Sequence, residues 1–196
     1  MMKTMFGILA AVAVMSACGG DAKKSATPES SSPVASAPAK ATTPAVAACP
    51  TPPPGPPSTV IYSAPATSQT QAVLNSAQAA SGTCTDIATF TFAGPDVPGY
   101  EVKYVPATLA CGSGNPVTTA GPAQLTLRFE PAVGHDNSGN ATVSPLSFAP
   151  NLASIKELKS TCDFEGVVAW VVGTESRYYT VTTAQSPARI IVKVYQ

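Results

Sequence analysis

The sequence predicts an all-β fold, a β-sandwich of short antiparallel strands. Apolar and polar residues alternate with a period of two in most segments after residue 84, and this alternation is typical of half-buried strands. Clusters of Gly, Pro, Asn, Asp and Ser separate these segments, and such clusters are typical of turns. About seven short strands with regular turns favour two packed sheets.

The alternation assigns one face of each expected strand to the core. The opposite face carries mainly polar or charged side chains. Only residues 70–80 and 154–160 have patterns that are compatible with a helix. The residues expected to face the core are Ala88, Phe90 and Phe92 in 86–93, Tyr100, Val102 and Tyr104 in 100–105, Leu125, Leu127 and Phe129 in 123–130, and Ala188, Ile190, Val192 and Val194 in 188–196.

Residues 166–173, GVVAWVVG, are apolar on both faces. We therefore expect a central strand here, with Trp170, the only tryptophan, in the core. Asp163 and Glu165 precede this segment and would lie on the same face of an extended chain. Two neighbouring carboxylates can shift each other's pKa, as an acid and base pair requires. No nucleophile motif accompanies them, so the start of a strand is the favoured interpretation.

The N-terminus has the layout of a secretion signal. Lys3 precedes an apolar run at 6–15, and small residues lead to Cys18. The end of this segment resembles a bacterial lipobox, so residues 1–17 are expected to be a lipoprotein signal peptide and Cys18 the lipidated residue. An ordinary secretion signal cut near Ala17 is the alternative. In a cell with two membranes, Gly19 favours anchoring in the outer membrane, facing the periplasm.

Composition divides the remainder of the chain into three parts. Residues 18–58 are rich in Pro, Ala, Ser and Thr, so we expect a disordered, lipid-anchored linker. Residues 59–83 are expected to form an N-terminal extension that packs on or flanks the domain. Residues 84–196 are long enough for one domain with its own core. This domain contains nine acidic and seven basic residues, which argues against nucleic acid as a partner.

Four cysteines besides Cys18 are candidates for disulfides in an exported protein. They are Cys49, Cys84, Cys111 and Cys162. Four cysteines allow three connectivities, and we expect at least one bridge among the last three. Cys49 is expected to join only if the chain from about residue 59 packs on the sandwich. The spacings contain no C-x-x-C motif and the chain has one histidine, so neither a zinc site nor any other cofactor is expected.

Five segments carry a family resemblance: PGYEVKYV, GSGNPV, AQLTLRFEPAVGHD, CDFEGVVAWVVG and SPARIIVKV. In this order they resemble the AMIN-like domain of secreted bacterial proteins and lipoproteins, over about residues 86–194. DFEGVV followed by Trp170 and Gly173 is the most specific segment. Cys111 departs from an acidic residue that is usual before the GSG turn. Together with Cys162 beside DFEG, this departure suggests a disulfide that most relatives lack.

The resemblance implies both a fold and a role. AMIN-like domains are related to AMIN, the module attached to N-acetylmuramoyl-alanine amidases and to secretins. This relation implies a β-sandwich that binds peptidoglycan or locates envelope machinery. Amidase activity does not carry over, because a separate zinc domain with His and Glu ligands performs that chemistry and this chain has one histidine.

His135 and Asp136 match the family's HD pair, and the sharper interpretation of this pair is a general base or a metal ligand. A structural role, in a loop that is stabilised by its own hydrogen bonds, is favoured because the pair begins the strong turn sequence HDNSGN. Glycans are usually held by aromatic faces and planar polar side chains. The remaining candidates for such contacts are Tyr100, Tyr104, Arg177 and Tyr178.

These observations favour a non-enzymatic lipoprotein of the cell envelope. Its sandwich would bind peptidoglycan or an envelope protein complex, while the N-terminal lipid attaches it to the membrane. One alternative is an adaptor that binds a secreted or outer-membrane protein through a sheet edge. A second alternative is a cell-wall hydrolase that uses Asp163, Glu165 and His135.

Overall fold

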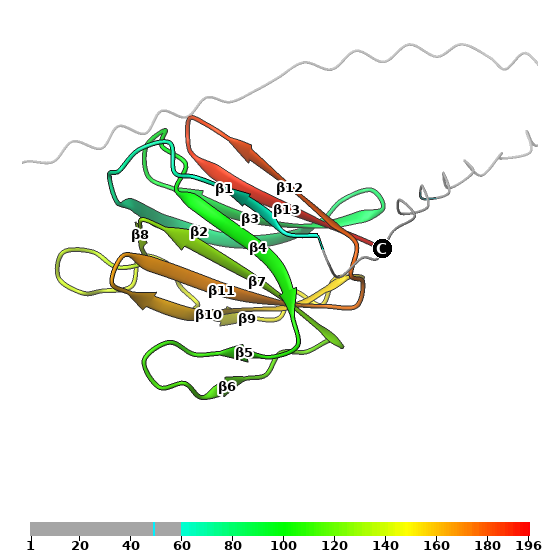
Figure 1. The fold of residues 1–196 in the computed structure, drawn as a ribbon. Coiled ribbons are helices and arrows are strands. Elements are labelled where there is room, and N and C mark those ends of the chain that lie inside the picture. Colours follow the sequence, from blue (N-terminus) through cyan, green and yellow to red (C-terminus); the bar gives the residue numbers. More distant parts are fainter. Residues whose placement is uncertain (1–48, 50–59) are drawn as a thin grey trace, which may run out of the picture. The chain divides into compact units, whose positions relative to one another are not determined.

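The fold of the domain is a β-sandwich, as the sequence predicts. A computed structural model describes Cys49 and residues 60–196. The expected signal peptide, the lipidated Cys18 and all of the linker except Cys49 lie outside the described residues. The described residues form 13 strands and no helix. Two sheets pack face to face, and a small two-stranded sheet lies beside them (Figure 1).

The larger sheet has six strands and the smaller one five. Every pairing is antiparallel except that of β2 with β8. The six-stranded sheet has the order β1 (Tyr62–Ala64), β4 (Gly99–Val105), β7 (Ala123–Glu130), β11 (Val167–Thr174), β10 (Ile155–Phe164) and β9 (Ser147–Phe148). The five-stranded sheet has the order β12 (Tyr179–Ala184), β13 (Arg189–Tyr195), β3 (Thr85–Phe92), β2 (Ala72–Ser81) and β8 (Ala132–Val133), and the small sheet pairs β5 (Thr108–Leu109) with β6 (Pro116–Val117).

The inner faces of the two sheets make the core. Trp170 is 1% exposed and its ring packs edge-on against Phe90, with 5.8 Å between the ring centroids. Phe129 contacts both Phe90 and Phe92 at 5.2 Å. The predicted inward faces of β3, β7 and β13 are confirmed, and so is β11 as a central strand between β7 and β10. Burial of these large side chains is the main force that holds the sheets together.

The two stretches whose patterns are compatible with a helix are both strands, β2 and β10. The alanines of β2 favour a helix, but pairing with β3 along most of its length outweighs that preference. In β10, Ile155 and Leu158 are three residues apart, which resembles helical spacing. A β-bulge between Ile155 and Glu157 changes the phase of the strand, so both apolar side chains are buried on one face.

Two disulfides close the structure. Cys111 joins Cys162, and Cys49 joins Cys84. The prediction of at least one bridge among the three cysteines of the domain is confirmed. The chain before Cys84 also packs on the sandwich, because β1 pairs with β4 and β2 pairs with β3. Cys49 is expected to form a bridge only if the chain from about residue 59 packs on the sandwich, and both the packing and the bridge are present.

The segment from residue 107 to residue 120, named the arm here, lies across the outer face of the six-stranded sheet. It contains β5 and β6 and is visible below that sheet in Figure 1. The Cys111–Cys162 bridge and a hydrogen bond from Cys111 N to Thr161 O (3.0 Å) fasten it to β10. Lys159 Nζ also donates to Thr118 O at 2.8 Å. The arm is therefore held at several points along its length.

Beneath the arm, β11 is buried on its outer face as well. Val171 points away from Trp170 and is nevertheless 0% exposed. Gly173 lies so close to the end of the arm that an added Cβ would be 2.0 Å from the carbonyl oxygen of Ala120. This contact gives a physical reason for the glycine that ends the GVVAWVVG segment.

Replacing Gly173 by alanine should therefore displace the arm and destabilise the domain. Backbone atoms cannot yield by the required distance, so we expect a loss of about 3 kcal/mol or more, which lowers Tm by on the order of 10 °C. Gly112→Ala, at φ 75 with nothing within 4 Å of the added Cβ, is the control and should lose only about 1 to 2 kcal/mol. Equal Tm values for the two variants would contradict this account of Gly173.

Candidate functional site

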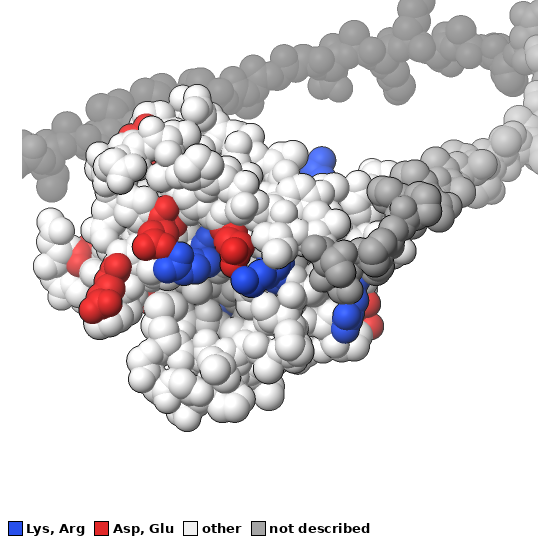
Figure 2. Space-filling model, in the orientation of Figure 1, with Lys and Arg blue, Asp and Glu red and all other residues white. Residues whose placement is uncertain are grey.

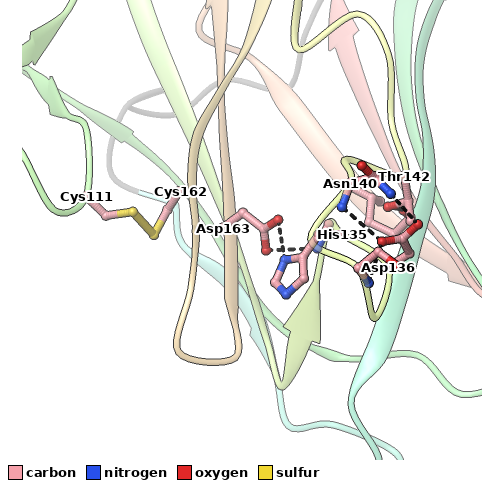
Figure 3. A network of polar contacts seen from close by, with 10 residues as sticks. Cys111, His135, Asp136, Asn140, Thr142, Cys162 and Asp163 are labelled. Atoms are coloured by element: carbon pink, nitrogen blue, oxygen red, sulfur yellow. Dashed lines mark hydrogen bonds and ion pairs between the residues drawn. A yellow bond between two sulfur atoms is a disulfide. The ribbon is translucent and has the colours of Figure 1, made fainter.

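Asp163 and His135 form a polar pair at one end of the sandwich. Asp163 belongs to the end of β10, and His135 follows β8 in the loop that continues to Ala141. The carboxylate accepts a hydrogen bond from Gly134 N at Oδ1 (2.9 Å) and contacts His135 Nδ1 through Oδ2 (2.7 Å), as Figure 3 shows. The side chains of His135 and Asp163 are 40% and 29% exposed, so the pair is open to solvent.

Asp136 is occupied by its own loop. Its carboxylate accepts hydrogen bonds from Ser138 N and Asn140 N at Oδ1 and from Asn140 Nδ2 at Oδ2 (Figure 3). The backbone hydrogen bond from Asn140 is the largest of the effects that lower the pKa of Asp136. These contacts match the interpretation of HDNSGN as a loop that its own hydrogen bonds stabilise.

Glu165 does not lie on an extended chain with Asp163, so the expected same-face pair of carboxylates is wrong. Phe164 pairs with Val167, which leaves Glu165 and Gly166 as the two central residues of a tight hairpin turn. Both have positive φ values, 50° and 79°, as the turn type that suits a twisted hairpin requires. The strand ends before Glu165, and its side chain projects from the turn.

The tyrosine candidates differ in how the structure holds them. Tyr104 OH donates to Ser176 O at 2.7 Å, and the Tyr104 ring packs edge-on against Tyr179. Burial raises the pKa of Tyr104 to about 12 and raises the pKa of Tyr179 as well. Tyr100 is half-buried against the core, and Tyr178 is also half-buried.

Arg177 is separate from the Asp163–His135 pair. It lines a pocket of about 400 Å³ with Tyr104 and Gln124, near the end of β11 at Thr174. Asp163 pairs with Val168 at the opposite end of β11. The candidates therefore do not form one site. One end of the sandwich, where β10 ends at Phe164, contains His135, Asp136, Asp163 and Glu165.

Sequence reasoning missed a groove between the arm and the six-stranded sheet, named the arm groove here. It has a volume of about 480 Å³ and is lined by Leu109, Cys111, Arg128, Glu130, Thr161, Cys162, Phe164, Glu165, Val167 and Ala169. Phe164 and Leu109 are 60% and 59% exposed, the highest values among the large apolar side chains described. Arg128 and Glu130 form an exposed ion pair on the same surface. Acidic and basic side chains alternate across this face, above the arm in Figure 2.

A signal for this groove was present in the sequence. Phe164 stands between two acidic residues and directly before the turn in CDFEG. A large apolar side chain at a hairpin turn has little neighbouring structure that could cover it. For the arm, which makes the second wall, the sequence signal is the disulfide between Cys111 and Cys162 that the family resemblance suggests, and the structure contains this bridge. The suggested bridge does not by itself predict a groove, because it fixes one point of the arm and leaves the path of the other residues open.

Within Cys49 and residues 60–196, no three His, Cys, Asp or Glu side chains gather in a way that could hold a metal ion. In the same residues, no helix is long and apolar enough to cross a membrane.

Comparison with known families identifies the class of domain. The AMIN-like domain family matches residues 72–196, more than half of the chain, beginning at the first residue of β2. The chain belongs to this family, and the resemblance inferred from its motifs is confirmed. Neither curated proteins nor solved structures give a match. AMIN-like domains are non-catalytic accessory modules, and membership of the family implies a cell-envelope or periplasmic protein with a peptidoglycan-associated or other envelope role.

The buried tyrosines predict how the domain responds to alkali. The folded state holds the Tyr104 proton up to about pH 12, while an exposed tyrosine releases it near 10.0. The stabilisation from the neutral phenol is therefore complete below pH 10 and is lost as the pH rises to about 12. We expect cooperative unfolding in this interval, with tyrosinate absorbance and loss of circular dichroism rising together. Tyrosinate formation near pH 10 by every tyrosine of a still folded domain would contradict the prediction.

Proposed function

We propose that this protein is a non-catalytic lipoprotein of the cell envelope and that it binds peptidoglycan through the arm groove. Family membership supports the envelope role, and the exposed Phe164 in the arm groove is the observation that supports the site. An exposed aromatic side chain in a concave surface is a frequent feature of ligand sites. Its neighbours Arg128 and Glu130 provide charged hydrogen-bonding groups within the same groove.

The arm groove is suited to binding because its walls are fixed before a ligand arrives. The disulfide between Cys111 and Cys162 ties the arm to β10, and the hydrogen bond from Cys111 N to Thr161 O adds a second link. A preorganised surface loses less conformational entropy when it binds than a flexible one does. Leu109 is thereby held in the same groove as Phe164.

The Asp163–His135 pair supports a structural role better than a catalytic one. Asp163 joins the loop after β8 to β10 through Gly134 N and His135 Nδ1. A hydrolase that uses a serine or cysteine nucleophile would hydrogen-bond that residue to His135, and no such bond occurs among the described residues. A hydrolase that uses two carboxylates would need both to face one cleft, whereas Asp163 is held by Gly134 N and His135 and Glu165 lies in the hairpin turn. We therefore assign the pair to positioning of the loop.

The linker is fastened at one end of the sandwich and the arm groove lies at the other end. The Cys49–Cys84 bridge joins the linker to the chain just before β3. Ile155, at the start of β10, donates its N–H to Asp86 beside this bridge (2.9 Å), and Phe164 is at the other end of the strand. A strand of 10 residues spans roughly 30 Å. The arm groove is therefore far from the point where the linker is fastened to the domain. If Cys18 carries a lipid anchor, the groove would face away from that attachment.

Peptidoglycan binding can be tested with isolated sacculi. The full chain should sediment with them, and Phe164→Ser should reduce the bound fraction at least about tenfold, as expected for a central apolar contact. Leu146→Ser is a matched control, because Leu146 is 49% exposed and lies outside the groove lining. Equal sedimentation of wild type and Phe164→Ser, or none by either, would contradict the proposal. Soluble fragments released in an Asp163-dependent way would instead support a hydrolase.

Membrane attachment is tested at Cys18. The Cys18→Ser variant should move from the membrane to the soluble envelope fraction and lose incorporation of labelled fatty acid. The reason is that each buried methylene of an acyl chain contributes about 0.8 kcal/mol to membrane binding. A variant that fractionates like the wild type, with no label in either protein, would exclude lipid anchoring and leave the groove proposal untouched.

A further inference from the structure

The charges of the outer face point to one kind of ligand for the arm groove. Cations on this face contact glutamates: Lys103 contacts Glu101, Arg128 contacts Glu130, and Lys159 contacts Glu157. Within the described residues, Glu165 has no ion-pair partner. Its carboxylate is therefore the charge in the groove lining that a ligand can pair with.

The apolar part of the groove lies next to this carboxylate. Phe164 directly precedes Glu165 in the chain, and Leu109 reaches the groove from the arm. The turn fixes Glu165 because both of its central residues occupy the left-handed region of φ. An exposed apolar surface beside one uncompensated negative charge is complementary to a group that is apolar and carries one positive charge.

We infer that the arm groove holds the peptide part of its ligand, with an apolar side chain against Phe164 and Leu109 and a free amino group at Glu165. This inference rests on the proposed binding of peptidoglycan, whose peptide stems contain apolar residues and a diamino acid. The hydroxyl groups of a glycan strand can donate hydrogen bonds to Glu165, but they are neutral and do not compensate its charge as an ammonium group does. The groove volume of about 480 Å³ lies in the range typical of sites for small ligands.

The inference is tested with two fluorescent peptides and the full chain. The first has the sequence Ala-Leu-Lys-Ala with a free lysine amine, and in the second that amine is acetylated. We expect the free amine to bind about 2- to 5-fold more tightly, the range that an exposed ion pair provides. This preference should shrink as salt is added, because salt screens exposed charges. A chitin oligosaccharide serves as the glycan probe and should not displace the peptide.

Matched variants assign the effect to the groove. Glu165→Gln should abolish the preference for the free amine, whereas Glu175→Gln, which removes another exposed carboxylate outside the groove lining, should retain it. Phe164→Ser and Leu109→Ser should each weaken both peptides, and Leu146→Ser should weaken neither. Circular dichroism and Tm confirm that each variant is folded. Equal binding of the two peptides to the wild type, or an unchanged preference in Glu165→Gln, would overturn the inference.

The sacculus assay separates this inference from the proposed function. Phe164-dependent sedimentation with sacculi, combined with no preference for the free amine, would overturn the inference and leave peptidoglycan binding in place. A Glu165-dependent preference without sedimentation would overturn peptidoglycan binding and identify the groove as a site for cationic peptides. Displacement of the peptide by the chitin oligosaccharide would assign the groove to glycan and overturn the inference.

Discussion

Burial of β11 on both of its faces is the constraint on which the rest of the structure depends. Trp170 faces the five-stranded sheet, and its neighbour Val171 points the other way and is equally buried. A strand in the middle of one sheet of a two-layer sandwich normally exposes its outer face. This strand needs a third layer, and the arm provides it at the close contact between Gly173 and Ala120. The arm groove exists because that third layer covers only part of the sheet.

The incomplete cover leaves the end of the β10–β11 hairpin open. Near Gly173 the arm lies directly on the sheet, while at the other end of β11 the surface around Val167 and Phe164 forms the floor and side of the groove. The Cys111–Cys162 bridge limits how far the arm can move from this position. Closing a loop of about this length typically contributes about 2 to 4 kcal/mol to stability. The same bridge that stabilises the domain thus also shapes the groove.

Much of the fold was predictable because local pattern and burial agree in β3, β7, β11 and β13. Period-two alternation in β3, β7 and β13 matches their buried faces, and the run of β11 that is apolar on both faces forms the central strand that it predicts. The prediction failed at β2 and β10, where local pattern and tertiary pairing disagree. Alanine-rich sequence favours a helix in isolation, and a bulge in β10 produces a three-residue apolar spacing that a helix would also produce. Both outcomes depend on neighbouring strands that lie far away in the sequence.

The candidate site was predictable only in part, for a related reason. The sequence places CDFEG before the β11 strand and predicts that Asp163 shares a face with Glu165. His135, 28 residues away, joins Asp163 in the sequence analysis only within the hydrolase alternative, whereas the structure pairs these two residues directly. An extended chain places residues i and i+2 on one face, and this rule fails where a turn begins. The Gly166 in the motif was a sign of such a turn, because the tight hairpin turn favours glycine at that position.

The motif acquires a single explanation once the register of β10 is known. Cys162 and Asp163 are consecutive residues on a strand, so their side chains point to opposite faces, as Figure 3 shows. The cysteine binds the arm on the outer face, and the carboxylate binds the loop at Gly134 and His135 on the other side. Phe164 then returns to the outer face, where the arm leaves it exposed. Two adjacent side chains therefore hold the segments on either side of the strand, and the phenyl ring that follows them is free to contact a ligand.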